Sequence, residues 1–111
     1  MSLELQVSPY FSADFDRQIA WYTEHASELI ARRYADAVTR SLGTLCENPD
    51  FGPRCEFQHA KLQALRFWQV ARPFQKHVIF FRHDEQTLFA ERLMHGSRDL
   101  PRRLLEPPVT N

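Results

Sequence analysis

Three short apolar segments in the C-terminal half of this chain constrain its fold more than any other feature: FWQV, HVIFF and LFAERLM. Their length and their β-branched and aromatic content predict β-strands, and the turn signals RPFQ and HDEQ separate them. Strands joined by such short turns form an antiparallel meander. The middle segment, residues 77–82, is apolar on both faces and is therefore predicted to be central in the sheet.

Cationic and imidazole side chains flank these strands, so the predicted sheet presents a basic surface. They are Arg66, Arg72, Lys76, His77, Arg82, His83, Arg92 and His95. Residues 58–111 hold nine Arg or Lys and five Asp or Glu, whereas residues 1–57 hold five and nine. The net charge of the whole chain is zero, but this asymmetry predicts that the basic half meets an acidic partner, either nucleic acid or an acidic protein segment.

The N-terminal half predicts one strand and two helices. Residues 3–7 alternate apolar and polar side chains, as in a half-buried strand. Ser8 and Pro9 then predict the N-cap and first residue of a helix, and apolar residues recur after them at spacings of three and four. Ser27 is the expected N-cap of a second helix, which Pro49 ends. Because only a few residues join the helices, we expect an antiparallel hairpin.

This order of elements predicts an α+β fold: an N-terminal strand, an antiparallel helical hairpin, a three-strand antiparallel meander and a short basic C-terminal segment. A length of 111 residues fits a single domain, with an ordered core over about residues 3–105 and a flexible tail at residues 106–111. No apolar run reaches the roughly 20 residues of a membrane span, and the N-terminus lacks the pattern of a secretion signal. We therefore expect a cytoplasmic protein with no membrane partner.

The cysteines and histidines predict no metal site. Cys46 and Cys55 are nine positions apart, which is neither a zinc-ligand spacing nor that of a redox pair, so we expect structural thiols. The histidines form no cluster with ligand spacing. Four of them are expected at solvated positions: His25, His59, His77 and His83.

Several motifs along the chain resemble those of ParE-type toxins. They are the NP pair after the second predicted helix, the strand HVIFFR and the terminal run HGSRDLPRRLL, in this order. Together with the order of elements, they make about residues 3–105 similar to ParE-type toxins. These toxins belong to the ParE/RelE superfamily of bacterial type II toxin–antitoxin modules.

The resemblance implies a protein that binds and inhibits DNA gyrase, although the superfamily shares its fold with ribosome-dependent RNases. It also implies a hetero-oligomer with a cognate, ParD-like antitoxin that neutralises the toxin. Such antitoxins usually carry a ribbon-helix-helix DNA-binding half, and their extended C-terminal segment wraps the helical hairpin and the sheet of the toxin. Operator DNA is then contacted only indirectly, through the antitoxin, and no cofactor is needed.

An alternative function is that of a RelE-like, ribosome-dependent mRNA endonuclease. Attack of a 2′-hydroxyl on the adjacent phosphate needs a base, an acid and cations, for which His95, Arg82 and Arg66 are candidates. RNases of this fold commonly carry a tyrosine near the end of the last strand, where this chain has Gly96. Its tyrosines are expected in the helices, away from the sheet: Tyr10, Tyr22 and Tyr34. Binding is therefore favoured over catalysis, and His95 is alternatively a residue whose ring caps the Gly96 turn.

Two sets of residues are candidates for binding. Arginines of the C-terminal segment suit an acidic target through bidentate contacts: Arg98, Arg102 and Arg103. Arg98 alternatively pairs with a nearby carboxylate, whereas Arg102 and Arg103 are expected to be free. Exposed aromatic and cationic side chains are candidates for antitoxin binding: Trp21, Arg66, Trp68, Arg72, Phe74 and Lys76. A third hypothesis is a non-toxic co-repressor that works through the antitoxin.

Overall fold

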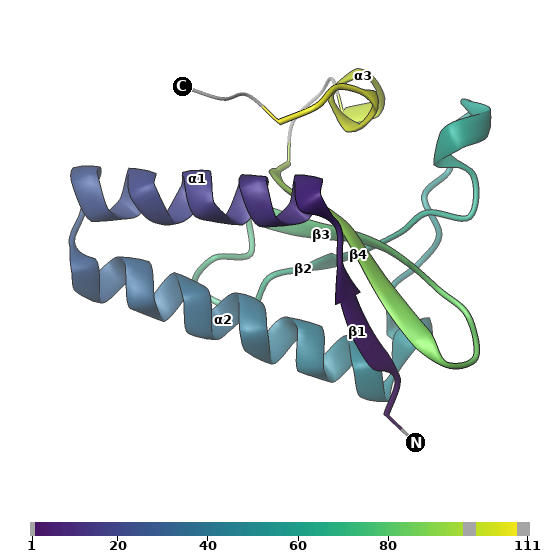
Figure 1. The fold of residues 1–111 in the computed structure, drawn as a ribbon, viewed down its shortest axis with the longest axis horizontal. Helices are drawn as coiled ribbons and strands as arrows, with labels where there is room; N and C mark the ends of the chain where they lie inside the picture. Colours follow the sequence, from purple (N-terminus) through teal and green to yellow (C-terminus); the bar gives the residue numbers. More distant parts are fainter. Residues whose placement is uncertain (1, 97–99, 109–111) are drawn as a thin grey trace.

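A four-stranded sheet with the order β1-β4-β3-β2 forms the centre of the molecule (Figure 1). The computed structural model describes residues 2–96 and 100–108. The strands are β1 (Glu4–Val7), β2 (Arg66–Gln69), β3 (His77–His83) and β4 (Thr87–His95). The helices are α1 (Pro9–His25), α2 (Glu28–Glu47) and α3 (Leu100–Leu105), with single 3₁₀ turns η1 (Pro49–Phe51) and η2 (Ala60–Leu62). This arrangement confirms the predicted α+β fold.

The sheet contains the predicted meander and one pairing that links the two ends of the chain. β2, β3 and β4 are antiparallel neighbours, and β3 is central as expected. β1 lies parallel to β4, with Glu4 opposite Thr87 and Val7 opposite Ala90. The prediction of a half-buried first strand was wrong, because all four residues of this edge strand are exposed. Leu3, just before it, packs against the core.

Both long helices begin and end where the sequence predicts. The Ser8 hydroxyl accepts the Phe11 N–H at 2.9 Å, and the Ser27 hydroxyl accepts the Ile30 N–H at 3.1 Å. Each bond satisfies a backbone donor that the first turn of a helix leaves unpaired. Pro49 follows α2 and begins η1. Within residues 2–96 and 100–108, no helix is long and apolar enough to cross a membrane.

Apolar clusters lie on both faces of the sheet. The helical hairpin covers one face, where residues such as Tyr34, Ile79 and Phe81 are fully buried. The loop around η2 and the helix α3 cover part of the other face; their cluster comprises Leu62, Leu65, Phe80, Met94 and Leu104. Successive residues of β3 therefore point to opposite clusters, as the two-residue period of a strand requires.

A β-bulge interrupts β4 at Glu91. Phe80 lies opposite Arg92 but Phe81 lies opposite Ala90, so Glu91 is the extra residue. β1 ends at this point, and α1 covers the next part of the β4 edge: the Ser8 hydroxyl donates to the Glu91 carbonyl at 2.6 Å. Strand pairing thus gives way to side-chain bonds from α1.

The bulge is followed by a buried ion pair between Asp14 of α1 and Arg92. Asp14 accepts the Arg92 Nε and Nη2 hydrogens at 2.8 and 3.1 Å, and the Leu93 N–H at 3.0 Å. The remaining Arg92 nitrogen, Nη1, donates to the carbonyls of Arg103 and Glu106 at 3.1 and 2.6 Å. One guanidinium therefore joins α1, β4 and the end of α3.

Replacing Asp14 with Ala is expected to lower the free energy of unfolding by about 3–5 kcal/mol, because it leaves a buried guanidinium and the Leu93 N–H without a partner. Urea denaturation followed by circular dichroism measures the change. Asp16→Ala, at an exposed position of the same helix, is the matched control, with an expected change within about 0.5 kcal/mol. Equal effects of the two substitutions contradict the central role of the pair.

Candidate functional site

The three residues proposed for RNA cleavage are not brought together. His95 pairs with His77 at one end of β3, whereas Arg82 lies five residues further along that strand, about 16 Å away at 3.3 Å per residue. Arg66 lies opposite Phe81, so Arg66 and Arg82 point to opposite faces of the sheet. No single phosphate can contact all three side chains.

Arg66 and Arg82 both hold loops in place through backbone carbonyls. Arg66 Nη1 donates to the Gly52 carbonyl at 2.7 Å. Arg82 donates to the carbonyls of Lys61 and Gln63, at 2.5 Å in each case. These contacts close the connection between α2 and β2 against the sheet. The two cations identified from the sequence therefore have structural roles.

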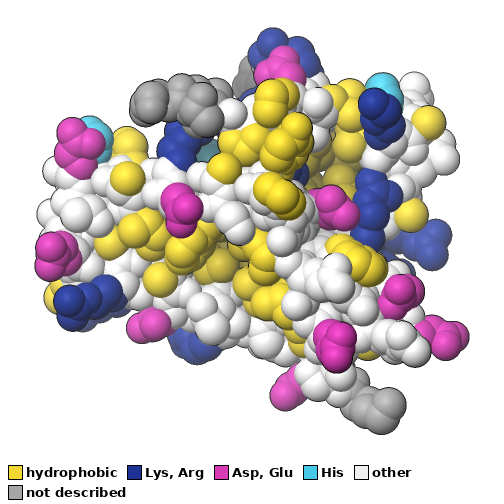
Figure 2. All heavy atoms as spheres, viewed as in Figure 1, with side chains coloured by type: hydrophobic (Ala, Val, Ile, Leu, Met, Phe, Trp, Pro, Cys, Tyr) yellow, Lys and Arg dark blue, Asp and Glu magenta, His cyan; other side chains and the backbone are white. Residues whose placement is uncertain are grey.

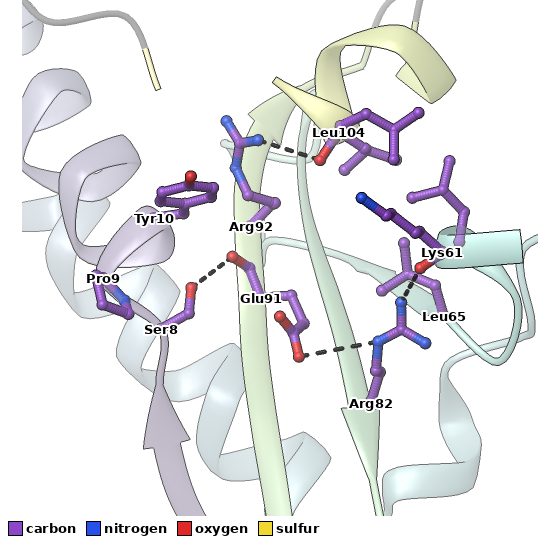
Figure 3. A pocket seen from close by; sticks show the side chains of 11 residues that line it. Ser8, Pro9, Tyr10, Lys61, Leu65, Arg82, Glu91, Arg92 and Leu104 are labelled. Carbon is purple, nitrogen blue, oxygen red and sulfur yellow. Dashed lines mark hydrogen bonds and ion pairs between the residues drawn. The ribbon is translucent and has the colours of Figure 1, made fainter. Parts of the chain in front are cut away.

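A hollow of about 360 Å³ lies on the face of the sheet opposite the hairpin, between the start of α1, η2 and α3 (Figure 3). Its charged lining residues are Lys61, Arg82, Glu91 and Arg92, around leucines of η2 and α3. Arg82 Nε lies 3.9 Å from the Glu91 carboxylate, and Arg92 is neutralised by Asp14. Most of the positive charge in this hollow is thus compensated within the chain.

His77 is buried, which corrects the expectation that it is solvated. Tyr22 bonds its Nε2 through the hydroxyl at 3.3 Å, and the rings of Tyr34 and His95 lie 5.0 and 5.4 Å away. Burial, assisted by the neighbouring His95, lowers the pKa of His77 from 6.5 to about 4. The expectation that the tyrosines lie away from the sheet was also wrong, because Tyr22 and Tyr34 pack directly on this first residue of β3.

His95 and Tyr34 lie beside His77 at this end of the sheet. His95 contacts the Gly96 carbonyl through Nδ1 at 3.0 Å, which agrees with its interpretation as a turn-capping residue. The Tyr34 hydroxyl is buried and has no hydrogen-bond partner in the described part of the chain. Burial raises its pKa, so it stays protonated.

The candidate antitoxin-binding residues are divided between separate surfaces. Trp21 is 50% exposed on α1 and stacks on His25 with 4.7 Å between ring centroids. Phe74 was wrongly placed on the surface: it is 7% exposed and packs edge-on against Tyr34 in the core. Lys76, two residues after Phe74, is exposed.

Trp68 and Arg72 line a groove between α2 and the outer edge of β2, with a volume of about 650 Å³. The complete lining is Arg40, Ser41, Thr44, Pro53, Phe67, Trp68, Gln69, Val70, Ala71, Arg72 and Gln75. Arg40 and Arg72 also border a neighbouring hollow of about 410 Å³ with Arg33 and Asp36. The two spaces therefore share a basic boundary.

The sequence interpretation missed Arg40 and Gln69 as surface residues of this groove. Arg40 lies on the exposed face of α2, where a charged side chain is expected on any solvated helix and does not by itself indicate a site. Gln69 lines the groove on the edge strand β2. A side-chain pattern does not indicate which strand lies at the edge of a sheet.

The basic C-terminal segment is only partly described. Arg98 lies outside the described residues. Arg102 is exposed on α3 and pairs with Glu106 at 3.6 Å, while the carbonyl of Arg103 accepts from Arg92. Neither arginine is without a partner, so the expectation that both are free was wrong.

Comparison with known proteins identifies a matching family model and a similar fold. The family model described as the ParE toxin of the type II toxin–antitoxin system parDE matches residues 5–100. Among solved structures, a chain of the chromosomal ParDE TA system from P. aeruginosa is similar, with a TM-score of 0.69 and 14% sequence identity. The match covers 86% of this chain and 98% of that one, and shows a shared fold. No match was found among curated proteins.

The buried His77 predicts that acidification destabilises the fold. Between about pH 6.5 and about pH 4, the unfolded chain carries a proton at this residue that the folded chain lacks, so stability is lost as the pH falls. Its contribution between pH 7 and pH 4.5 is about 2–3 kcal/mol at 1.36 kcal/mol per pKa unit. Urea denaturation at both pH values should therefore show a smaller difference for His77→Phe than for the wild type.

His25→Phe is the control for this measurement, since His25 is exposed on α1. The control is expected to keep the pH dependence of the wild type. A His77→Phe variant that loses as much stability on acidification as the wild type contradicts the assignment.

Proposed function

Because the chain belongs to the ParE toxin family of type II toxin–antitoxin systems, we propose that it is the toxin of such a module and acts by binding and inhibiting DNA gyrase. The family match over residues 5–100 carries this proposal. Under this proposal, the chain is a single toxin domain that needs no cofactor. A gyrase target also implies a cytoplasmic location.

The geometry supports binding rather than RNA cleavage. The three candidate catalytic residues lie at two ends and on two faces of the sheet, and Arg66 and Arg82 are occupied by backbone carbonyls. A general base and its cations must lie within hydrogen-bond reach of one reacting phosphate. Messenger RNA cleavage therefore serves as the alternative outcome of the test below.

The proposed partner is a cognate antitoxin of the ParD type, which forms a hetero-oligomer with this chain and contacts operator DNA for both. Hydrophobic side chains gather along the seam between α1 and α2 (Figure 2), where Phe15, Ile19 and Ile30 are only partly buried. The remaining candidates for antitoxin binding are Trp21, Trp68, Arg72 and Lys76. Phe74 is excluded by its burial and Arg66 by its bond to Gly52.

The proposed gyrase-binding element is the basic segment that includes α3. Arg102 is exposed and Arg103 partly exposed on this helix, and Arg92 fixes the helix to β4. Planar guanidinium groups on a short helix suit bidentate contacts with carboxylates of a protein target. Arg98, which precedes the helix in the sequence, is a further candidate for this contact.

Expression of the protein without its antitoxin is expected to cause filamentation and DNA breaks, with protein synthesis continuing. Arg102→Ala with Arg103→Ala should weaken gyrase inhibition by about a hundredfold or more, because each of the two charge-assisted contacts contributes about 1.5–3 kcal/mol. Supercoiling by purified gyrase in the presence of each variant measures this. Co-expression of the cognate antitoxin should restore growth to cells that carry the wild-type toxin.

The matched control is the pair Arg32→Ala and Arg33→Ala, two adjacent exposed arginines of α2. It should inhibit supercoiling as the wild type does. Immediate arrest of translation with cleaved messenger RNA contradicts the gyrase proposal and favours the endonuclease. Unimpaired growth in every case favours the non-toxic co-repressor.

A further inference from the structure

Strand β1 forms one edge of the sheet, and the outer side of this edge is open. Glu4 and Ser8 donate their N–H groups to carbonyls on the β4 side, at 2.9 Å in each case. Because consecutive residues of a strand turn their backbone groups to opposite sides, the N–H and C=O groups of Leu5 and Val7 point away from β4. Within the described part of the chain, no bond to these outward groups is found.

An open edge of this kind is a template for another strand. A lysine, a proline or a bulge within the strand often protects such edges, and β1, with the sequence ELQV, contains none of these. Its apolar side chains are instead exposed, Leu5 by 43% and Val7 by 41%. The opposite edge differs, because Arg66 of β2 pairs there with Arg54.

The face of the molecule that carries the β1 edge is accessible to a large partner. β1 lies in front of the other strands in Figure 1, and all four of its residues are exposed. Hydrophobic side chains gather on the same face around the start of α1 (Figure 2). Tyr10, which is 48% exposed in the first turn of α1, extends the apolar surface beyond Val7.

The outward groups permit one register for antiparallel pairing of β1 with a second copy of itself. A twofold axis at Gln6 places Leu5 opposite Val7 of the partner subunit, and each of the two resulting pairs exchanges two N–H···O=C bonds. An axis at Leu5 instead requires the Leu3 N–H, which already donates to a carbonyl of α2 at 2.8 Å. An axis at Val7 brings in Pro9, which has no N–H.

This register is also complementary in its side chains and charges. Leu5 lies beside Val7 of the partner subunit, and the two Gln6 amides meet at the axis. The two copies of Glu4 are about 14 Å apart along the strands. Each Glu4 lies opposite Ser8 of the partner subunit, the N-cap of a helix whose first turn contains no acidic residue. A carboxylate there is stabilised by the positive end of the helix dipole.

We propose that this protein associates with a second copy of itself through β1, by antiparallel pairing about a twofold axis at Gln6. The four strands of each copy then form one continuous sheet, with both helical hairpins on the same face. Such an isologous contact requires a self-complementary surface, which the β1 register provides. Because the contact is small, we expect a weak dimer that forms as the protein concentration rises.

Charge substitution at the axis tests the proposal, because residue 6 meets its own copy there. Gln6→Glu and Gln6→Lys each place like charges opposite one another and should raise the dissociation constant of the dimer about tenfold or more. A mixture of the two variants places opposite charges there and should restore the constant to within about threefold of the wild-type value. Sedimentation equilibrium of the full-length protein measures each constant.

Gln69→Glu is the matched control, since Gln69 is an exposed glutamine on the opposite edge strand, β2. It should leave the dissociation constant within about twofold of the wild-type value. Hydrogen exchange followed by NMR gives a second measurement that needs no substitution. The amides of Leu5 and Val7 should exchange about tenfold more slowly at concentrations where the dimer predominates, because they pass from water into backbone bonds.

Two results overturn the proposal. A wild type that stays monomeric up to about 1 mM does not associate through β1. If Gln6→Glu then weakens binding of the antitoxin from the co-expression experiment, the edge holds a segment of that protein instead. A dimer whose dissociation constant is the same for the wild type and both Gln6 variants uses another surface.

Discussion

The buried pair of Asp14 and Arg92 holds together elements from both ends of the chain. Its two bonds of 2.8 and 3.1 Å join α1 to β4, and the same guanidinium donates to the carbonyls of Arg103 in α3 and of Glu106 just after it. Removing two charges from water is costly, so such a pair persists only where further hydrogen bonds satisfy both groups. Here the Leu93 N–H and the α3 carbonyls supply those bonds, and the position of α3 depends on them.

The sequence predicted the elements whose signals are local. Ser8, Ser27 and Pro49 act within four residues of their own positions, and the structure has the caps and the helix end that they predict. The parallel pairing of β1 with β4 joins residues about eighty positions apart, and no periodicity in either strand specifies it. Alternation in residues 3–7 also fits an exposed edge strand, because it reports the strand and not its burial.

Candidate sites were harder to predict because a cation has no visible partner in a sequence. Arg66, Arg82 and Arg92 look alike as strand-end arginines, yet all three bond to backbone carbonyls of distant segments. His77 and Phe74 are likewise buried by contacts with Tyr22 and Tyr34 of the helical hairpin, which covers this face of the sheet. Conversely, the open edge at Leu5 and Val7 is defined by what the neighbouring strand leaves unpaired, which only the register of β1 and β4 reveals.

The arrangement of the proposed antitoxin-binding and target-binding residues constrains how an antitoxin can neutralise the protein. Trp68 lies on β2 and lines the groove between α2 and β2, whereas α3 is tied to β4, with β3 between the two strands. An antitoxin segment that occupies only the groove therefore leaves Arg102 exposed on α3. Neutralisation then requires either that the antitoxin continues from the groove to α3, or that its bulk keeps the proposed target away from that helix. The first case predicts an antitoxin segment long enough to cross the molecule, and the apolar seam between α1 and α2 offers a path for it.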